Sequence, residues 1–233
     1  MRDHRAKGLG CSLRRLALAG LALLPLAGQA SEVDPWESFN RPVFVFNDTL
    51  DRWALKPLAQ GYQKVTPQFL EDGVGNVFAN LGEVGNFANN LLQGKFHDAG
   101  VDTARLLINT IAGVGGFFDV AQHAGLPRND EDFGQTLGVW GLSSGPYLML
   151  PLLGPSTPRD AGGRLVDSVH SFYGAIDHVP TRNVTRAVDV VDTRADLLAA
   201  ERVISGDRYV FIRNAYLQSR EFKVHDGQVE DDF

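Results

Sequence analysis

Apolar residues recur at intervals of three and four along most of this chain, which is the spacing of one face of an α-helix. The pattern predicts amphipathic helices over residues 43–57, 72–94, 96–112, 184–198 and 209–216. No convincing parallel strands interrupt this pattern before residue 141. The periodicity therefore predicts an all-α protein.

The first helical region begins with a capping pattern. Asp34 can cap a helix, Pro35 suits the first helical position, and Glu37 completes the pattern three residues after the cap. A second amphipathic segment follows and is expected to end near Pro57, because an interior proline removes a hydrogen bond and clashes with the preceding turn.

Aromatic side chains are frequent in this N-terminal region, namely Phe39, Phe44, Phe46 and Trp53. They allow two interpretations. Such residues anchor helices that lie in a membrane surface, and they also build ordinary hydrophobic cores. The spacing alone favours a core.

The helix predicted over residues 72–94 is rich in asparagine on its polar faces. Asparagine is a poor helix former, so helix propensity does not explain its presence. Asn76 and Asn80 are candidates for lining a lipid path or for contacting lipid head groups. The alternative is a solvated helix face.

Residues 133–158 contain no charged side chain, which is a longer uncharged run than a membrane-spanning helix requires. Glycines and prolines punctuate this run, so its backbone must break. Broken backbone is tolerated in lipid only where protein covers it or where it lines a watery cavity. Two interpretations follow: a buried segment of a soluble core, or a re-entrant, cavity-lining element of a membrane protein.

Four glycines within the uncharged run, Gly134, Gly138, Gly141 and Gly145, are separated by four, three and four residues. On one helix they would form a stripe that lets another backbone approach closely, as small residues do between membrane helices. We take them as candidate positions for close packing beside a lipid path. The alternative is a set of independent turns.

The sequence from Gly141 to Gly145 also matches the G-x-S-x-G nucleophile elbow of lipases and esterases, with Ser143 as the candidate nucleophile. Downstream acids and His170 and His178 follow in the chain order of a hydrolase. An elbow requires a preceding strand in an alternating βαβ chain, and the sequence predicts helix there. The acids and histidines lack the spacing of a zinc site or a calcium loop, so no metal or other cofactor is expected.

Residues 1–30 have the features of a secretory signal peptide, with a basic start, an apolar run and a small-residue cleavage site. The formal net charge of −6 becomes more negative once this basic segment is removed, which disfavours nucleic acid as a partner. The sole cysteine, Cys11, would leave with the signal peptide. Residues 224–233 are polar and predict a disordered tail.

Several long motifs resemble the MlaA (VacJ) family. They are DPWESFNRPVFVFND at residues 34–48, RLLINTIAGVGGFFDVA at 105–121, DFGQTLGVWG at 132–141, GPYLMLPLLGPSTPRD at 145–160 and DTRADLL at 192–198. The resemblance implies a ring of helices in the inner leaflet of the outer membrane with a polar channel for phospholipids, and it places the N-terminal aromatic residues at the membrane. It also implies porin trimers and the periplasmic lipid carrier MlaC as partners. Family members typically carry an acylated cysteine after the signal, and this sequence has none there.

We therefore expect a single all-α domain over residues 31–223, arranged as a ring of amphipathic helices embedded in one membrane leaflet. The function that the resemblance implies is non-enzymatic phospholipid transport at the outer membrane, from the outer leaflet to a periplasmic carrier, which maintains lipid asymmetry. The alternatives are a phospholipid or ester hydrolase that uses Ser143, or a purely structural protein of the outer membrane or cell surface.

Overall fold

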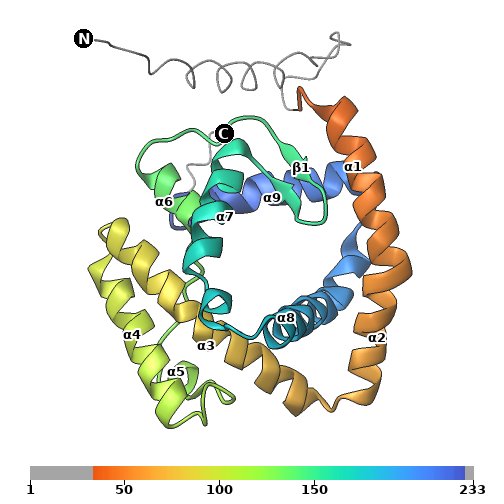
Figure 1. The fold of residues 1–233 in the computed structure, drawn as a ribbon. Coiled ribbons are helices and arrows are strands. Elements are labelled where there is room, and N and C mark those ends of the chain that lie inside the picture. The colour runs from red at the N-terminus through yellow and green to blue at the C-terminus, as the bar shows by residue number, and fades with distance from the viewer. Residues whose placement is uncertain (1–33, 229–233) are drawn as a thin grey trace, which may run out of the picture.

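The computed structural model describes residues 34–228, whose helices are arranged as a ring (Figure 1). The predicted signal peptide at residues 1–30 and the end of the predicted tail, residues 229–233, lie outside the described residues. The helices are α1 (Glu37–Leu50), α2 (Lys56–Val65), α3 (Gln68–Leu92), α4 (Phe96–Ile111), α5 (Val120–His123), α6 (Phe133–Val139), α7 (Pro158–His170), α8 (Val179–Ala200) and α9 (Arg208–Val224). The prediction of an all-α fold is confirmed.

Contacts between elements close the ring. Helix α2 packs on α8, α8 packs on α3, and α3 packs on α4 and reaches α6. Helix α6 contacts α7 and α9, and the hairpin formed by β1 (Leu148–Leu150) and β2 (Gly154–Ser156) returns to α1. Short helical turns η2 (Phe172–Ala175) and η3 (Glu201–Val203) lead into and out of α8. No helix within residues 34–228 is long and apolar enough to cross a membrane.

The predicted end of the first amphipathic segment near Pro57 is wrong, because the helical path continues to Val65. A π-helical turn, η1 (Asp51–Leu55), joins α1 directly to α2, and Pro57 lies in the first turn of α2. A proline is tolerated at such a position, since the first N–H groups of a helix have no partner within it. The start of α1 also differs from the prediction, because Trp36 rather than Asp34 is its N-cap residue.

Two asparagines of α1 hold the hairpin. The side-chain amide of Asn40 donates to the carbonyl oxygen of Tyr147 at 2.9 Å, and its oxygen accepts from the backbone N–H of Met149 at 2.8 Å. Asn47, seven residues later on the same face, makes the equivalent pair of bonds to Leu150 and Leu152 at 2.9 and 2.8 Å. These four bonds, which we call the amide clamp, join α1 to the hairpin and so close the ring.

Helices α6 and α7 approach so closely that glycine is required at their crossing. A Cβ atom on Gly163 of α7 would lie 2.3 Å from the backbone nitrogen of Gly134 on α6. Backbone cannot withdraw as a flexible side chain can, so any larger residue must separate the helices. By contrast, a Cβ atom on the adjacent Gly162 would meet nothing within 4 Å.

We therefore predict different effects for two neighbouring substitutions. Gly163→Ala should destabilise the protein by about 1–3 kcal/mol, because it forces α6 and α7 apart. The matched control Gly162→Ala should be neutral or stabilising, because alanine favours helix over glycine. Thermal unfolding of the two purified variants in the same detergent tests this, and equal midpoints would contradict the close crossing.

Candidate functional site

The interior of this protein is polar, whereas its large apolar side chains are mostly exposed. Within residues 34–228, twenty polar or charged residues are buried, against eight hydrophobic ones: Ala59, Ala99, Val101, Ala121, Tyr147, Met149, Ala195 and Tyr209. Trp53 and Ile111 are each 80% exposed, and Phe96 is 73% exposed. Charged residues are almost never fully buried in globular proteins unless they are paired. Such a surface is suited to an apolar environment.

One buried ionic network lies between α3, α4 and α5. Arg105 is 1% exposed and donates to Glu83 at 2.6 Å, to Asp119 at 2.8 Å and to the carbonyl oxygen of Leu126 at 2.7 Å. Asn109 also donates to Asp119, at 3.0 Å. Burial raises the pKa of Asp119, but the bonds from Arg105 and Asn109 outweigh burial and bring it down to about 2. The network therefore holds Asp119 as a carboxylate.

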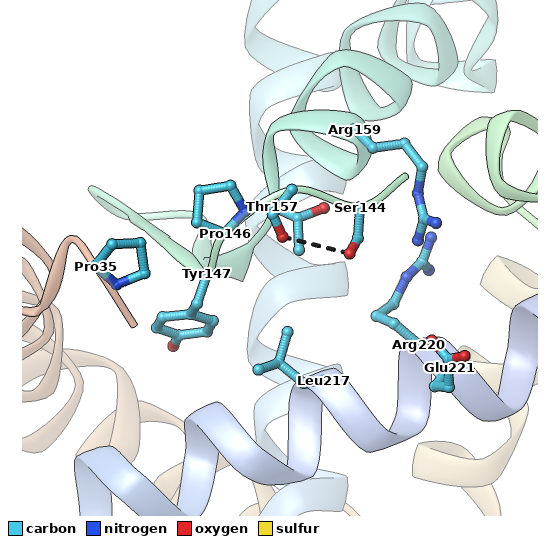
Figure 2. A pocket seen from close by; sticks show the side chains of 10 residues that line it. Pro35, Ser144, Pro146, Tyr147, Thr157, Arg159, Leu217, Arg220 and Glu221 are labelled. Carbon is cyan, nitrogen blue, oxygen red and sulfur yellow. Dashed lines mark hydrogen bonds between the residues drawn. The ribbon is translucent and has the colours of Figure 1, made fainter. Parts of the chain in front are cut away.

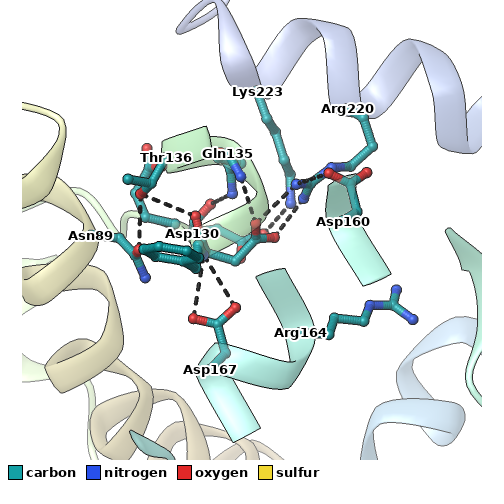
Figure 3. A network of polar contacts seen from close by, with 12 residues as sticks. Asn89, Asp130, Gln135, Thr136, Asp160, Arg164, Asp167, Arg220 and Lys223 are labelled. Atoms are coloured by element: carbon teal, nitrogen blue, oxygen red, sulfur yellow. Dashed lines mark hydrogen bonds and ion pairs between the residues drawn. The ribbon is translucent and has the colours of Figure 1, made fainter. Parts of the chain in front are cut away.

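A second network joins α6, α7 and α9 (Figure 3). Arg220 of α9 donates to Asp132, which caps α6, at 2.9 Å and to Asp160 of α7 at 3.0 Å. Tyr216 donates to the same Asp160 at 2.7 Å. Burial raises the pKa of Asp160, but Tyr216, Arg220 and Arg159 together lower it. Arg220 therefore pairs with two acids, one at the start of α6 and one on α7.

A cavity of about 430 Å³ opens beside this second network (Figure 2). The guanidinium groups of Arg159 and Arg220 face one another on one side of it, and Tyr147 lies on the other side. The hydroxyl of Tyr147 is buried without a hydrogen-bond partner, as is Nε of Arg220. We call this the arginine cavity.

A larger cavity of about 550 Å³ lies between the start of α3, α5 and the loop before it, and α8. Its lining includes four carboxylates, three phenylalanines and one arginine, which are Glu71, Asp72, Asp119, Asp196, Phe69, Phe117, Phe118 and Arg128. We call it the acidic cavity. Its lining has an excess of negative charge, whereas the lining of the arginine cavity contains two arginines that lie close together.

The four predicted membrane-interface residues occupy two environments. Phe39 and Phe46 are each 51% exposed, and Trp53 is the most exposed of the set. Phe44 is half-buried and packs edge to face on Tyr209, with ring centroids 5.5 Å apart. Three of the four therefore present their rings to the surroundings, and Phe44 belongs to the small apolar cluster around Tyr209.

The two candidate asparagines make contacts inside the protein. Asn76 lines the acidic cavity, donates to the carbonyl oxygen of Phe117 at 3.3 Å and accepts from Arg128 at 3.3 Å. Asn80 is 4% exposed and donates to Thr110 of α4 at 3.0 Å. The solvated helix face considered as an alternative does not fit Asn80.

The four glycines divide between a helix and the turns after it. Gly134 and Gly138 lie on α6, where added Cβ atoms would meet Asp160 at 2.8 Å and Arg159 at 2.8 Å respectively. Gly141 and Gly145 follow the helix and have φ of +90° and +73°, a conformation that favours glycine. Gly145 also lines the arginine cavity. Close packing thus applies to the first pair and turn geometry to the second.

Ser143 is exposed in the loop that follows α6. The strand that a nucleophile elbow needs is absent before it, since helix precedes it within the described residues. Nδ1 of His170 lies 3.0 Å from the carbonyl oxygen of Val166 on the same helix, and His178 caps the start of α8 with its Nδ1 2.7 Å from Oγ1 of Thr181. No group of residues within 34–228 has the arrangement of a metal site.

Sequence reasoning missed three residues that position the hairpin and the helices around the arginine cavity. They are Asn40, Asn47 and Gly163. Their partners lie far away along the chain, so no local pattern identifies them. Tyr147 lies within the uncharged run at residues 133–158 and Arg159 directly follows it, and this position was the only sequence signal for either residue.

The amphipathic helices form a ring with an apolar exterior and an interior of paired polar groups. Such an exterior is suited to contact with lipid. This arrangement defines a class of helical ring proteins. The profile of the family described as MlaA lipoprotein matches residues 32–223. The chain belongs to the MlaA family, and the resemblance noted from its motifs is confirmed.

Named relatives agree with this assignment. The intermembrane phospholipid transport system lipoprotein MlaA of Haemophilus influenzae is 35% identical over 93% of this chain and 90% of its own length. The Escherichia coli protein of the same name is 35% identical over 94% and 90%. An uncharacterized protein of Rickettsia conorii is 37% identical over 82% and 78%.

A solved structure described as "Structural basis for maintenance of bacterial outer membrane lipid asymmetry" has the same fold. It matches with a TM-score of 0.72 at 34% identity, covering 82% of this chain and 98% of that chain.

The buried carboxylate of Asp119 predicts an acid-sensitive stability. Its pKa of about 2 lies below the value of about 3.9 for an unfolded aspartate, so its contribution is complete above about pH 4 and is lost as pH falls through 2. Asp119→Asn should therefore flatten the fall in unfolding midpoint between pH 4 and pH 2. Asp98→Asn, which removes an exposed carboxylate of α4, is the control. Identical pH profiles for Asp119→Asn and the wild type would contradict the ionic role of the network.

Proposed function

We propose that this protein is a non-enzymatic path for phospholipids, which removes mislocalised phospholipids from the outer leaflet of the outer membrane and so maintains lipid asymmetry. The observation that carries the proposal is the reversed distribution of side chains, with exposed rings and aliphatic groups around a paired polar interior. Embedding such a surface in lipid removes its apolar area from water and leaves the polar groups available to a head group.

The geometry supports insertion into one leaflet. Many helices expose large apolar side chains, from Phe39 of α1 to Phe222 of α9. Amphipathic helices of this kind lie in the interface and bury one face in lipid. A location at the periplasmic, inner leaflet follows if residues 1–30 act as the signal peptide that their composition predicts.

Partners complete the path in this proposal. Two relatives are named as components of an intermembrane phospholipid transport system. By the family resemblance, we expect an outer-membrane porin trimer beside the ring and the periplasmic carrier MlaC as the acceptor of phospholipid. Transport of this kind needs no catalytic residue on the ring itself.

A complementation experiment tests the proposal. Deletion should place phospholipid in the outer leaflet, detected by an outer-leaflet acylation assay and by increased detergent sensitivity, and the wild-type gene should restore the barrier. Ser143→Ala should restore it equally, because transport loses no nucleophile. Failure of Ser143→Ala at normal protein abundance would favour the hydrolase, and a deletion without any leaflet defect would contradict transport.

Membrane attachment gives a separate prediction. The mature protein should carry no acyl chain and still fractionate with the outer membrane, because Cys11 precedes the apolar run of the signal. Apolar embedding should resist a high-salt wash, which screens charge but not the hydrophobic effect. Mass spectrometry for a diacylglyceryl adduct and quantitative release by salt are the two measurements that would oppose this prediction.

A further inference from the structure

The acidic cavity contains negative charge that the protein does not neutralise. Glu71 is 6% exposed and lines the cavity, and its carboxylate makes no hydrogen bond or ion pair within residues 34–228. Asp196 also lines it without such a partner, and Asp72 accepts only from the neutral amide of Gln68, at 2.9 Å. Burying charge without a counter-ion is costly, so these carboxylates favour a cationic group in the cavity.

Neighbouring acids increase this cost. Burial raises the pKa of Glu71, and the charges of Asp192, Asp196 and Asp72 raise it further. Asp192 lies behind the cavity, where its carboxylate would be 3.2 Å from a Cβ atom on Gly75. The buried acids Glu83 and Asp160 each have an arginine partner, whereas the carboxylate of Glu71 has none within residues 34–228.

Aromatic rings lie beside these carboxylates. The ring of Phe117 presses on α3, since a Cβ atom on Gly73 would lie 2.2 Å from it. Phe118 packs edge to face on Phe117, with ring centroids 5.0 Å apart, and is 54% exposed. Aromatic faces attract organic ammonium groups, which are less strongly hydrated than metal ions.

A positive group lies on the same cavity. Arg128 is half-exposed and uses one terminal nitrogen, Nη2, to donate to Asp119 at 3.1 Å and to Asn76 at 3.3 Å. Its remaining N–H groups are available to a phosphate oxygen, which arginine binds well. The cavity therefore presents acids for a cation and an arginine for an anion.

We propose that the acidic cavity binds the zwitterionic head group of an aminophospholipid, with its ammonium at Glu71 and Asp196 and its phosphate at Arg128. The inference rests on the proposed function, since it names the head group that the lipid path would recognise. A volume of about 550 Å³ lies within the range of small-molecule sites. An anionic phosphatidylglycerol head group lacks the ammonium and meets uncompensated carboxylates there.

The test uses the purified full chain in detergent and two soluble probes, dihexanoyl phosphatidylethanolamine and dihexanoyl phosphatidylglycerol. Calorimetric titration should show about tenfold tighter binding of the ethanolamine lipid. Glu71→Gln and Asp196→Asn should each abolish most of this preference, and affinity for the glycerol lipid should not fall. Glu221→Gln removes the same charge beside the arginine cavity and is the control that should keep the preference.

Stability measurements separate binding from folding. Glu71→Gln should unfold at the same or a higher temperature, because it relieves repulsion with Asp72, Asp192 and Asp196. Loss of binding by a well-folded Glu71→Gln variant then reports the site itself. If that variant unfolds earlier, Asp196→Asn carries the test.

Three results would overturn the inference. They are equal affinity for both lipids, a preference that survives both substitutions, and calcium or magnesium chloride binding at Glu71 in competition with the ethanolamine lipid. Equal affinity together with normal clearance of outer-leaflet phospholipid would leave the proposed function standing. Binding of neither lipid, together with a deletion that causes no leaflet defect, would remove both.

Discussion

Pairing of buried charge is the constraint on which this structure depends. With so few buried apolar side chains, the helices are held together by groups such as Arg105, which bridges Glu83 and Asp119 at 1% exposure. Removing one partner of such a buried pair typically costs about 3–5 kcal/mol, because the other charge stays buried and unpaired. Arg220 has the same role between α6, α7 and α9. The apolar residues are thereby left to the outer surface.

The sequence predicted the helices well and their environment poorly. Helical spacing identifies one apolar face, but the same spacing results whether that face meets a protein core or lipid. Leu107 and Ile111 illustrate this, since they lie four residues apart in the helix predicted over residues 96–112 and both are exposed in the structure. Only the polar character of what lies inside separates the two cases, and that is a tertiary property.

Features that depend on distant partners could not be predicted. A proline such as Pro57 normally stops an α-helix. Here a π-helical turn precedes Pro57 and lets the helical path continue, and no sequence pattern that we used predicts this turn. The Asn40 amide bonds to a residue 107 positions away, so nothing near Asn40 indicates its role. In contrast, the density of glycine and proline in residues 133–158 correctly predicted a broken backbone, because those residues limit conformation locally.

Two kinds of contact close the ring, namely the uncharged amide clamp and ionic pairs. The clamp's four hydrogen bonds come from the uncharged side chains of Asn40 and Asn47, which gain and lose no proton across the range in which carboxylates titrate. The contact of Arg220 with Asp132 is ionic and weakens when that acid is protonated. Acid therefore weakens the contact between α9 and α6 before it affects the bonds between α1 and the hairpin.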